Sequence, residues 1–185
     1  MNVPASVAGH ERARLFCALR LPASVLDALR TWQDEHIQAR RAVTRANLHI
    51  TLAFLGYRPV QELAGIVEAT SEVATAAHPI RLEPVRYRET RSVGMLVLSD
   101  EGGAATALAE DLHGRLEALG VYEREQRPWL PHLTVVRFRE RPRLQPPLPT
   151  LEPFSPSDAA VYHSLLRSTG AQYEVVESFP LGLGG

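Results

Sequence analysis

Lysine is missing from this sequence, and all 20 basic residues are arginines. Without a lysine amine, the chain cannot form a Schiff base or a lysine–adenylate intermediate, and it cannot build a phosphate-binding loop of the G-x-x-x-x-G-K type. Enzyme classes that depend on an amine nucleophile are therefore excluded.

Cysteine is almost absent as well, because Cys17 is the only one. A single thiol excludes an intramolecular disulfide and a zinc site built from several thiolates. Cys17 lies in the apolar run "RLFCALRL", where we expect a buried and unreactive thiol. The first residues, "MNVPASVAGHERAR", hold no apolar signal-peptide core, and no run of 18 apolar residues occurs. We therefore expect a cytoplasmic protein that does not enter a membrane.

A strong net charge is also lacking, since 20 basic and 21 acidic residues give a formal charge of −1. No overall positive field exists to gather nucleic acid, so any contact with nucleic acid should be local. The densest basic stretch is "RYRETR" at 86–91. We interpret it as a solvated hairpin tip, with an RNA-contacting loop as the alternative.

What is present is an alternation of apolar patterns with strand and helix periods along 185 residues, enough for one core or two small lobes. Residues 1–12 are expected to be a flexible N-terminus, and the proline-rich 141–153 a connector. The predicted strands are 14–21, 48–55, 79–87, 93–99, 131–139 and a pair around the turn 168–170. The predicted helices are 21–40, 59–77 and 104–119. Strands that come both singly with helices and in adjacent pairs predict an α+β fold with antiparallel sheets in a single domain of two lobes.

Two short motifs repeat the same pattern: "NLHITLAFLG" and "PHLTVVRF" each place His-x-Thr at the start of an apolar, β-rich run. Side chains alternate between the faces of a strand, so each histidine should share a face with the threonine two residues later. The polar faces predicted in this way comprise His49, Thr51 and Ala53 in one strand and His132, Thr134 and Val136 in the other. The opposite, core-facing residues are predicted to be Leu48, Ile50, Leu52 and Phe54, and Leu133 and Val135.

The repeated pair has a clear chemical use. Near neutral pH an imidazole accepts a proton and an imidazolium donates one. A hydroxyl two residues along the strand reaches the same side and donates to an oxygen of a bound group. Two such pairs together supply a base, an acid and two hydrogen-bond donors for a phosphoryl group.

These motifs resemble the paired H-x-T signatures of the 2H phosphoesterase superfamily, and most closely its RNA 2′,3′-cyclic phosphodiesterase, or 2′-5′ RNA ligase, branch. The "RLFCALRLP" run and the tail "VYHSLLRSTGAQYEVVESFPL" also resemble that family. The resemblance implies a bilobal, pseudo-symmetric 2H phosphoesterase (LigT-like) fold with a central cleft. A departure is Val136, where the family more often has alanine.

The resemblance also implies roles. His49 would be the proton donor and His132 the proton acceptor, while Thr51 and Thr134 would bind the phosphate. The substrate would be RNA or a nucleotide with a 2′,3′-cyclic phosphate end, which opens to a 2′-phosphate in a reaction that needs no metal or other cofactor. The reverse reaction would join RNA ends without ATP. We expect a monomer.

Further candidates stand near the motifs. Arg137 is a candidate to bind the phosphate. It lies five residues after His132, however, and this odd number places its side chain on the other face of the strand unless a bulge intervenes. Trp129 could stack on a base or pack structurally. Tyr57 and Arg58 are expected on a loop after the first motif, either contacting the nucleotide or forming a solvated turn. His163 is expected to be structural.

Alternatives from other classes remain open at this point. A metal hydrolase would use His49, His132 and His163 as ligands, although no carboxylate or cysteine accompanies either motif closely. A non-catalytic RNA-binding module would retain the fold without turnover. Within the 2H superfamily itself, other cyclic or 2′-5′ nucleotides are alternative substrates.

Overall fold

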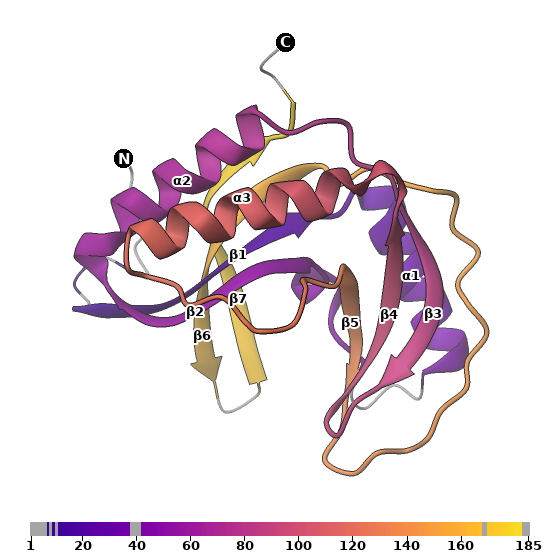
Figure 1. The fold of residues 1–185 in the computed structure, drawn as a ribbon. Coiled ribbons are helices and arrows are strands. Elements are labelled where there is room, and N and C mark those ends of the chain that lie inside the picture. Colours follow the sequence, from indigo (N-terminus) through magenta and orange to yellow (C-terminus); the bar gives the residue numbers. More distant parts are fainter. Residues whose placement is uncertain (1–6, 8, 10, 38–41, 168–169, 183–185) are drawn as a thin grey trace.

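The computed structural model describes residues 7, 9, 11–37, 42–167 and 170–182 (Figure 1). Most of the expected flexible segment 1–12 lies outside these described residues. Within that segment, Val7 is fully buried and Arg12 already begins the first strand. No described helix is long and apolar enough to cross a membrane.

The larger of two antiparallel sheets has four strands in the order β2-β1-β6-β7. Their bounds are Arg12–Arg20 for β1, Ile50–Pro59 for β2, Asp158–Arg167 for β6 and Gly170–Pro180 for β7. Residues from both ends of the chain thus share one sheet. The predicted C-terminal pair of strands is confirmed, while residues 168 and 169 of the predicted turn lie outside the described residues and Gly170 already begins β7.

The smaller sheet has three strands in the order β3-β4-β5. These are β3 (Leu82–Glu89), β4 (Val93–Asp100) and β5 (His132–Arg137). Figure 1 shows the two sheets inclined to each other, with β2 and β5 as the strands that approach between them. The first His-x-Thr motif therefore belongs to the larger sheet and the second to the smaller one.

Among the described residues, three α-helices cover the outer faces of the sheets: α1 (Ala23–His36), α2 (Leu63–Thr75) and α3 (Ala104–Ala118). Helices α2 and α3 lie against the larger sheet, and α1 lies beside the smaller one (Figure 1). The buried face of α1 comprises Val25, Leu29, Trp32 and Gln33, at the spacing expected of an amphipathic helix. The predicted α+β class and order of elements are confirmed, with shifts of a few residues at element ends.

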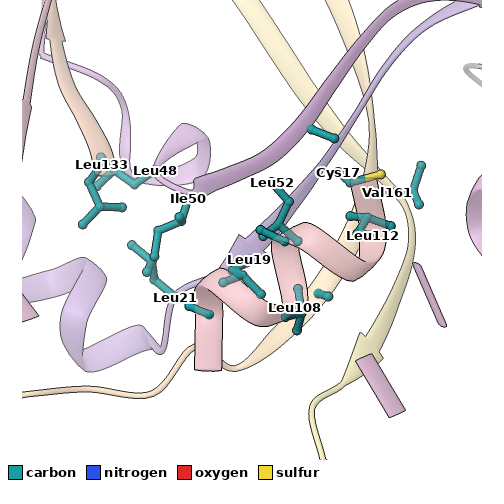
Figure 2. Packing of buried hydrophobic residues seen from close by; sticks show 14 of the residues in the cluster. Cys17, Leu19, Leu21, Leu48, Ile50, Leu52, Leu108, Leu112, Leu133 and Val161 are labelled. Atoms are coloured by element: carbon teal, nitrogen blue, oxygen red, sulfur yellow. The ribbon is translucent and has the colours of Figure 1, made fainter. Parts of the chain in front are cut away.

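One continuous core joins the helices to both sheets. Figure 2 shows part of this core, in which Leu19 and Leu52 of the larger sheet and Leu133 of the smaller sheet belong to the same buried cluster. Burial of apolar area of this kind contributes about 25 cal/mol per Å². The side of the larger sheet that faces away from α2 and α3 instead carries a separate cluster formed by Phe16, Ala18, Ala160 and Tyr162.

The proline-rich connector contains no strand in the described structure, as predicted, and it is tied to the hairpin of the smaller sheet. The buried carboxylate of Glu89 accepts hydrogen bonds from the Arg141 guanidinium at 3.1 Å and from the backbone N–H groups of Arg143 and Leu144 at 3.0 and 2.8 Å. Glu89, part of the "RYRETR" stretch, is therefore a structural anchor.

Candidate active site

The first motif begins one residue before β2, where hydrogen bonds fix the His49 ring. Its Nδ1 lies 2.8 Å from the carbonyl oxygen of Asn47, and its Nε2 lies 3.1 Å from the Thr51 hydroxyl oxygen. Because a carbonyl only accepts, Nδ1 carries the proton in the neutral ring. Nε2 then accepts from the Thr51 hydroxyl, and the prediction that these two side chains share a face is confirmed.

The second motif repeats this backbone arrangement. His132 Nδ1 lies 2.8 Å from the carbonyl oxygen of Leu130, again two residues before the histidine. Each imidazole thus donates Nδ1–H to a main-chain carbonyl and leaves Nε2 as the nitrogen that exchanges protons. His132 and Thr134 are both partly exposed in β5.

A β-bulge follows the threonine in both motifs. In β2, Thr51 pairs with Ala18 and Ala53 with Cys17, so Leu52 is an additional residue. In β5, Thr134 pairs with Met95 and Val136 with Gly94, so Val135 is the additional residue. A bulge of this kind reverses the alternation of side chains beyond it. In both strands, the side chains after the bulge therefore point to the face opposite to the one that simple alternation predicts.

The bulges correct three of the predicted faces. Ala53 and Val136 do not line the polar face beside the histidines but are buried in the core, where a Cβ atom at Gly94 would collide with Val136. Phe54 was predicted to be in the core; it lies opposite Phe16 instead and is 50% exposed. Simple alternation failed because it assumes an uninterrupted strand.

The same shift brings Arg137 to the site-facing side of β5. It pairs with Val93, beyond the bulge, and its positive charge lowers the pKa of His49. Arg137 is five residues after His132, but the additional residue at the bulge places both side chains on the same face of the strand. Arg137 and Phe54 occupy corresponding positions five residues after the two histidines.

Each bulged carbonyl is held by a buried polar side chain from a helix, and the sequence analysis missed both. His113 of α3 donates from Nε2 to the carbonyl oxygen of Leu52 at 2.8 Å. Gln33 of α1 donates to the carbonyl oxygen of Val135 at 2.8 Å. A bulge removes backbone groups from the ladder, and a buried carbonyl needs a replacement partner. The one available signal was a polar residue on the apolar face of each helix.

The two motifs meet between the sheets. Strands β2 and β5 are in contact, and Trp129 bridges them by donating its indole N–H to the carbonyl oxygen of Thr51 at 3.0 Å. Trp129 thus has a structural role that positions the second motif beside the first. The charge of His132 also lowers the pKa of His49, so the two imidazoles interact electrostatically.

The surroundings of His49 are aromatic. Its ring centroid lies 4.9 Å from that of Phe16, 5.9 Å from that of Tyr162 and 5.4 Å from that of Tyr173. Burial lowers the pKa of His49 from 6.5 to about 4, the hydrogen bond to Asn47 opposes this shift, and the positive charges of Arg137 and His132 add to it. The imidazole is therefore neutral near pH 7.

Other predicted residues lie apart from this pair. Tyr57 and Arg58 belong to β2 rather than to a loop, and Tyr57 is 55% exposed. His163 is buried opposite Leu15 on the side of the larger sheet that the helices cover, away from His49. This position separates His163 from the metal site considered above. Burial raises the pKa of the Cys17 thiol to about 11, as expected for an unreactive cysteine.

No group of three histidine, cysteine, aspartate or glutamate side chains in the described residues is arranged to hold a metal ion. What the site does assemble is two imidazoles with Nε2 available, two hydroxyls and one guanidinium. Each of these groups can donate a hydrogen bond to an anion, and the two imidazoles can also exchange a proton with it. The arrangement is chemically suited to a phosphate ester.

Comparison with known proteins agrees with this chemistry. The sequence matches the profile of the 2′-5′ RNA ligase superfamily over residues 21–171. It is 31% identical over 179 residues to the RNA 2′,3′-cyclic phosphodiesterase of Thermus thermophilus, covering 91% of this chain and 90% of that protein. It is 27% identical over 129 residues to the RNA 2′,3′-cyclic phosphodiesterase of Escherichia coli, covering 69% of this chain and 73% of the relative.

Solved structures have the same fold. The crystal structure of protein TT0787 from Thermus thermophilus matches with a TM-score of 0.77 and 30% identity, covering 91% of this chain and 97% of that one. Escherichia coli LigT in its apo form matches with a TM-score of 0.77 at 22% identity, covering 94% and 99%. The second likeness concerns the fold alone.

Proposed function

Because the chain belongs to the 2′-5′ RNA ligase superfamily, we propose that it is an RNA 2′,3′-cyclic phosphodiesterase that converts 2′,3′-cyclic phosphate ends into 2′-phosphates. The observation that carries this proposal is the approach of two imidazoles from separate sheets, each with Nδ1 fixed by a main-chain carbonyl. One phosphorus atom between them would face both Nε2 atoms.

In the proposed mechanism His132 accepts a proton from water, and the oxygen of that water forms a bond to phosphorus. The bond from phosphorus to the 3′ oxygen breaks, and His49 donates a proton to that leaving oxygen. The 2′ oxygen keeps the phosphate. Solvent then removes the proton from His132 and returns one to His49. A metal or nucleotide cofactor is not needed in this scheme.

Thr51 and Thr134 are proposed to bind the non-bridging oxygens. The Thr51 hydroxyl lies 3.1 Å from His49 Nε2, and we propose that it turns toward the phosphate when the substrate binds. Hydrogen bonds to a charged acceptor contribute about 1.5–3 kcal/mol each.

The low pKa of His49 bears on its proposed role as proton donor. A cyclic phosphate diester carries a negative charge into the site, and a negative charge close to an imidazole raises its pKa. The substrate itself therefore favours the protonated ring that the leaving oxygen needs. Arg137 would bind the same charge from the other strand.

The remaining candidate contacts are Trp129 and Tyr57. The Trp129 indole N–H is engaged with Thr51, so we propose that a base could meet only the ring face of this residue. Tyr57 is exposed farther along β2 and is proposed to contact nucleotides away from the cyclic end. We further propose that the protein acts as a cytoplasmic monomer, and that it performs the reverse, ATP-independent joining of RNA ends.

The test is turnover of a panel of nucleoside 2′,3′-cyclic monophosphates and oligonucleotides with a cyclic phosphate end, with products resolved as 2′- or 3′-phosphates. We expect 2′-phosphate products, and activity that survives excess EDTA. A 3′-phosphate product would contradict the assignment of the leaving oxygen. Activity lost to EDTA and restored by a divalent metal would favour the metal hydrolase, and RNA binding without turnover would favour the non-catalytic module.

A further inference from the structure

Two arginines of the "RYRETR" stretch share a face with the second motif. Arg86 of β3 lies directly opposite Val97 of β4, which in turn lies opposite His132. Arg88 lies opposite Met95, which lies opposite Thr134. Residues directly opposite in an antiparallel sheet project from the same side. Arg86 and Arg88 are therefore on the site-facing side of the smaller sheet, within β3 and not at the hairpin tip.

The distance between β3 and β5 suits a second phosphate next to one bound at His132 and Thr134. Adjacent strands are about 4.8 Å apart, which places β3 about 10 Å from β5. A ligand phosphate held at His132 and Thr134 would leave the next units of a polynucleotide within reach of the long arginine side chains. Arg137, which is on the same face of β5, extends this positive charge toward His49.

No ion pair in the described structure neutralises the arginines of this face, and the acidic residue on the same side of β3, Glu83 opposite Ser99, is not paired with them. Arg86, Arg88 and Arg137 are all exposed, and none of the ion pairs found among the described residues involves them. Arg30, Arg81 and Arg124 are exposed too, but each of these pairs with a carboxylate. Like charges gathered on one face oppose folding slightly. A polyanion lying across the face would remove that repulsion, whereas a cyclic mononucleotide would not extend to β3.

We propose that the face formed by Arg86, Arg88 and Arg137 binds the RNA strand that leads to the cyclic end, with Arg86 and Arg88 contacting its phosphates. The inference rests on the proposed function and narrows it, because it makes a cyclic-phosphate-ended oligonucleotide a better substrate than the corresponding nucleoside 2′,3′-cyclic monophosphate. Single-stranded RNA fits because arginine forks match phosphate oxygens and the face is an open, charged surface.

The experiment compares the wild-type protein with the double variant R86Q/R88Q on a cyclic-phosphate-ended oligonucleotide and on the cyclic mononucleotide with the same terminal base. We expect the ratio of the two kcat/KM values to fall about tenfold at low salt. Each lost phosphate contact on a single strand also reduces the slope of log affinity against log salt by about 0.7, so the variant should lose about 1.4 in slope. The control is R30Q/R124Q, which removes the same formal charge from arginines that pair with Asp34 and Glu117.

The outcomes separate this inference from the proposed function. An unchanged substrate ratio and an unchanged salt slope would overturn the inference, and so would an equal loss on both substrates. If the wild-type protein turned over neither substrate, the proposed function would fail. Fluorescence anisotropy with a 3′-hydroxyl oligonucleotide would then decide the inference alone: a slope lowered by R86Q/R88Q supports it, and an unaltered slope refutes it.

Discussion

The two His-x-Thr strands have the same backbone and different surroundings. In both, the histidine donates from Nδ1 to the carbonyl two residues earlier, and a bulge follows the threonine. His49 is packed among Phe16, Tyr162 and Tyr173, whereas no aromatic ring lies against His132 in the described structure. At the corresponding later position, β2 has the exposed Phe54 and β5 has Arg137.

This difference bears on the two roles that we propose for the histidines. An identical backbone frame places both Nε2 atoms similarly, but burial lowers the pKa of His49 to about 4. In the proposed mechanism His49 must donate a proton, so the negative charge of the bound phosphate would have to raise this pKa. The backbone thus supplies geometry, while side chains from other strands supply the chemical distinction.

Removing either imidazole should have the largest effect on turnover. His49→Ala and His132→Ala should each lower kcat on a cyclic-phosphate substrate at least ~10²-fold, because each removes a proton-transfer group. His36→Ala, on the exposed end of α1, is the control and should keep wild-type turnover. Wild-type turnover in either active-site variant would remove that residue from the mechanism.

Removing the hydroxyls tests whether the two strands contribute equally to phosphate binding. Thr51→Val and Thr134→Val keep the β-branched shape and should each cost about 1.5–3 kcal/mol of transition-state stabilisation, one hydrogen bond to a charged acceptor. The double variant should lose about the sum, measured as kcat/KM. A loss confined to one variant would show that a single strand holds the phosphate.

The bulges can be tested through the side chains that hold them. His113→Leu and Gln33→Leu each leave a buried carbonyl without its helix donor and should lower the free energy of unfolding by about 1–3 kcal/mol. Gln33 also donates to the carbonyl oxygen of Val43 at 3.1 Å, but Val135 keeps a second donor, the backbone N–H of Val43 at 2.9 Å. Leucine also removes the Gln33 Oε1 atom, which is buried without a hydrogen-bond partner in the described structure, so we expect Gln33→Leu to be the milder change. Urea denaturation measures both. An equal or larger effect of Gln33→Leu would contradict this ranking.

The lowered pKa of His49 predicts a pH dependence of the protein's stability. In the folded protein His49 should titrate near pH 4 by NMR, whereas unfolding returns it to about 6.5. The unfolded chain therefore binds more protons between these values, and the free energy of unfolding should decrease as pH falls from about 6.5 to about 4. His49→Gln should remove this component. A His49 that titrates near 6.5 in the folded protein would contradict it.

The sequence predicted the strands that carry the site better than the direction of individual side chains. The order of elements and the His49–Thr51 pairing followed from local patterns, because apolar periodicity and motif spacing are local properties. Ala53, Phe54 and Val136 were misplaced, since a bulge depends on how a neighbouring strand pairs. The side chains that hydrogen-bond to the bulges could not be predicted for a similar reason, because His113 binds the carbonyl of Leu52, which is 61 residues away in the sequence. The low pKa of His49 likewise depends on rings from β1, β6 and β7.

If both imidazoles contact one phosphate, an NMR titration with a nucleoside 2′-monophosphate will report on both rings at once. We expect the Nε2 resonances of His49 and His132 to shift together along one binding curve, with the pKa of His49 rising as the anion binds. A shift confined to one ring, or two rings that follow different binding curves, would show that they do not share a phosphate.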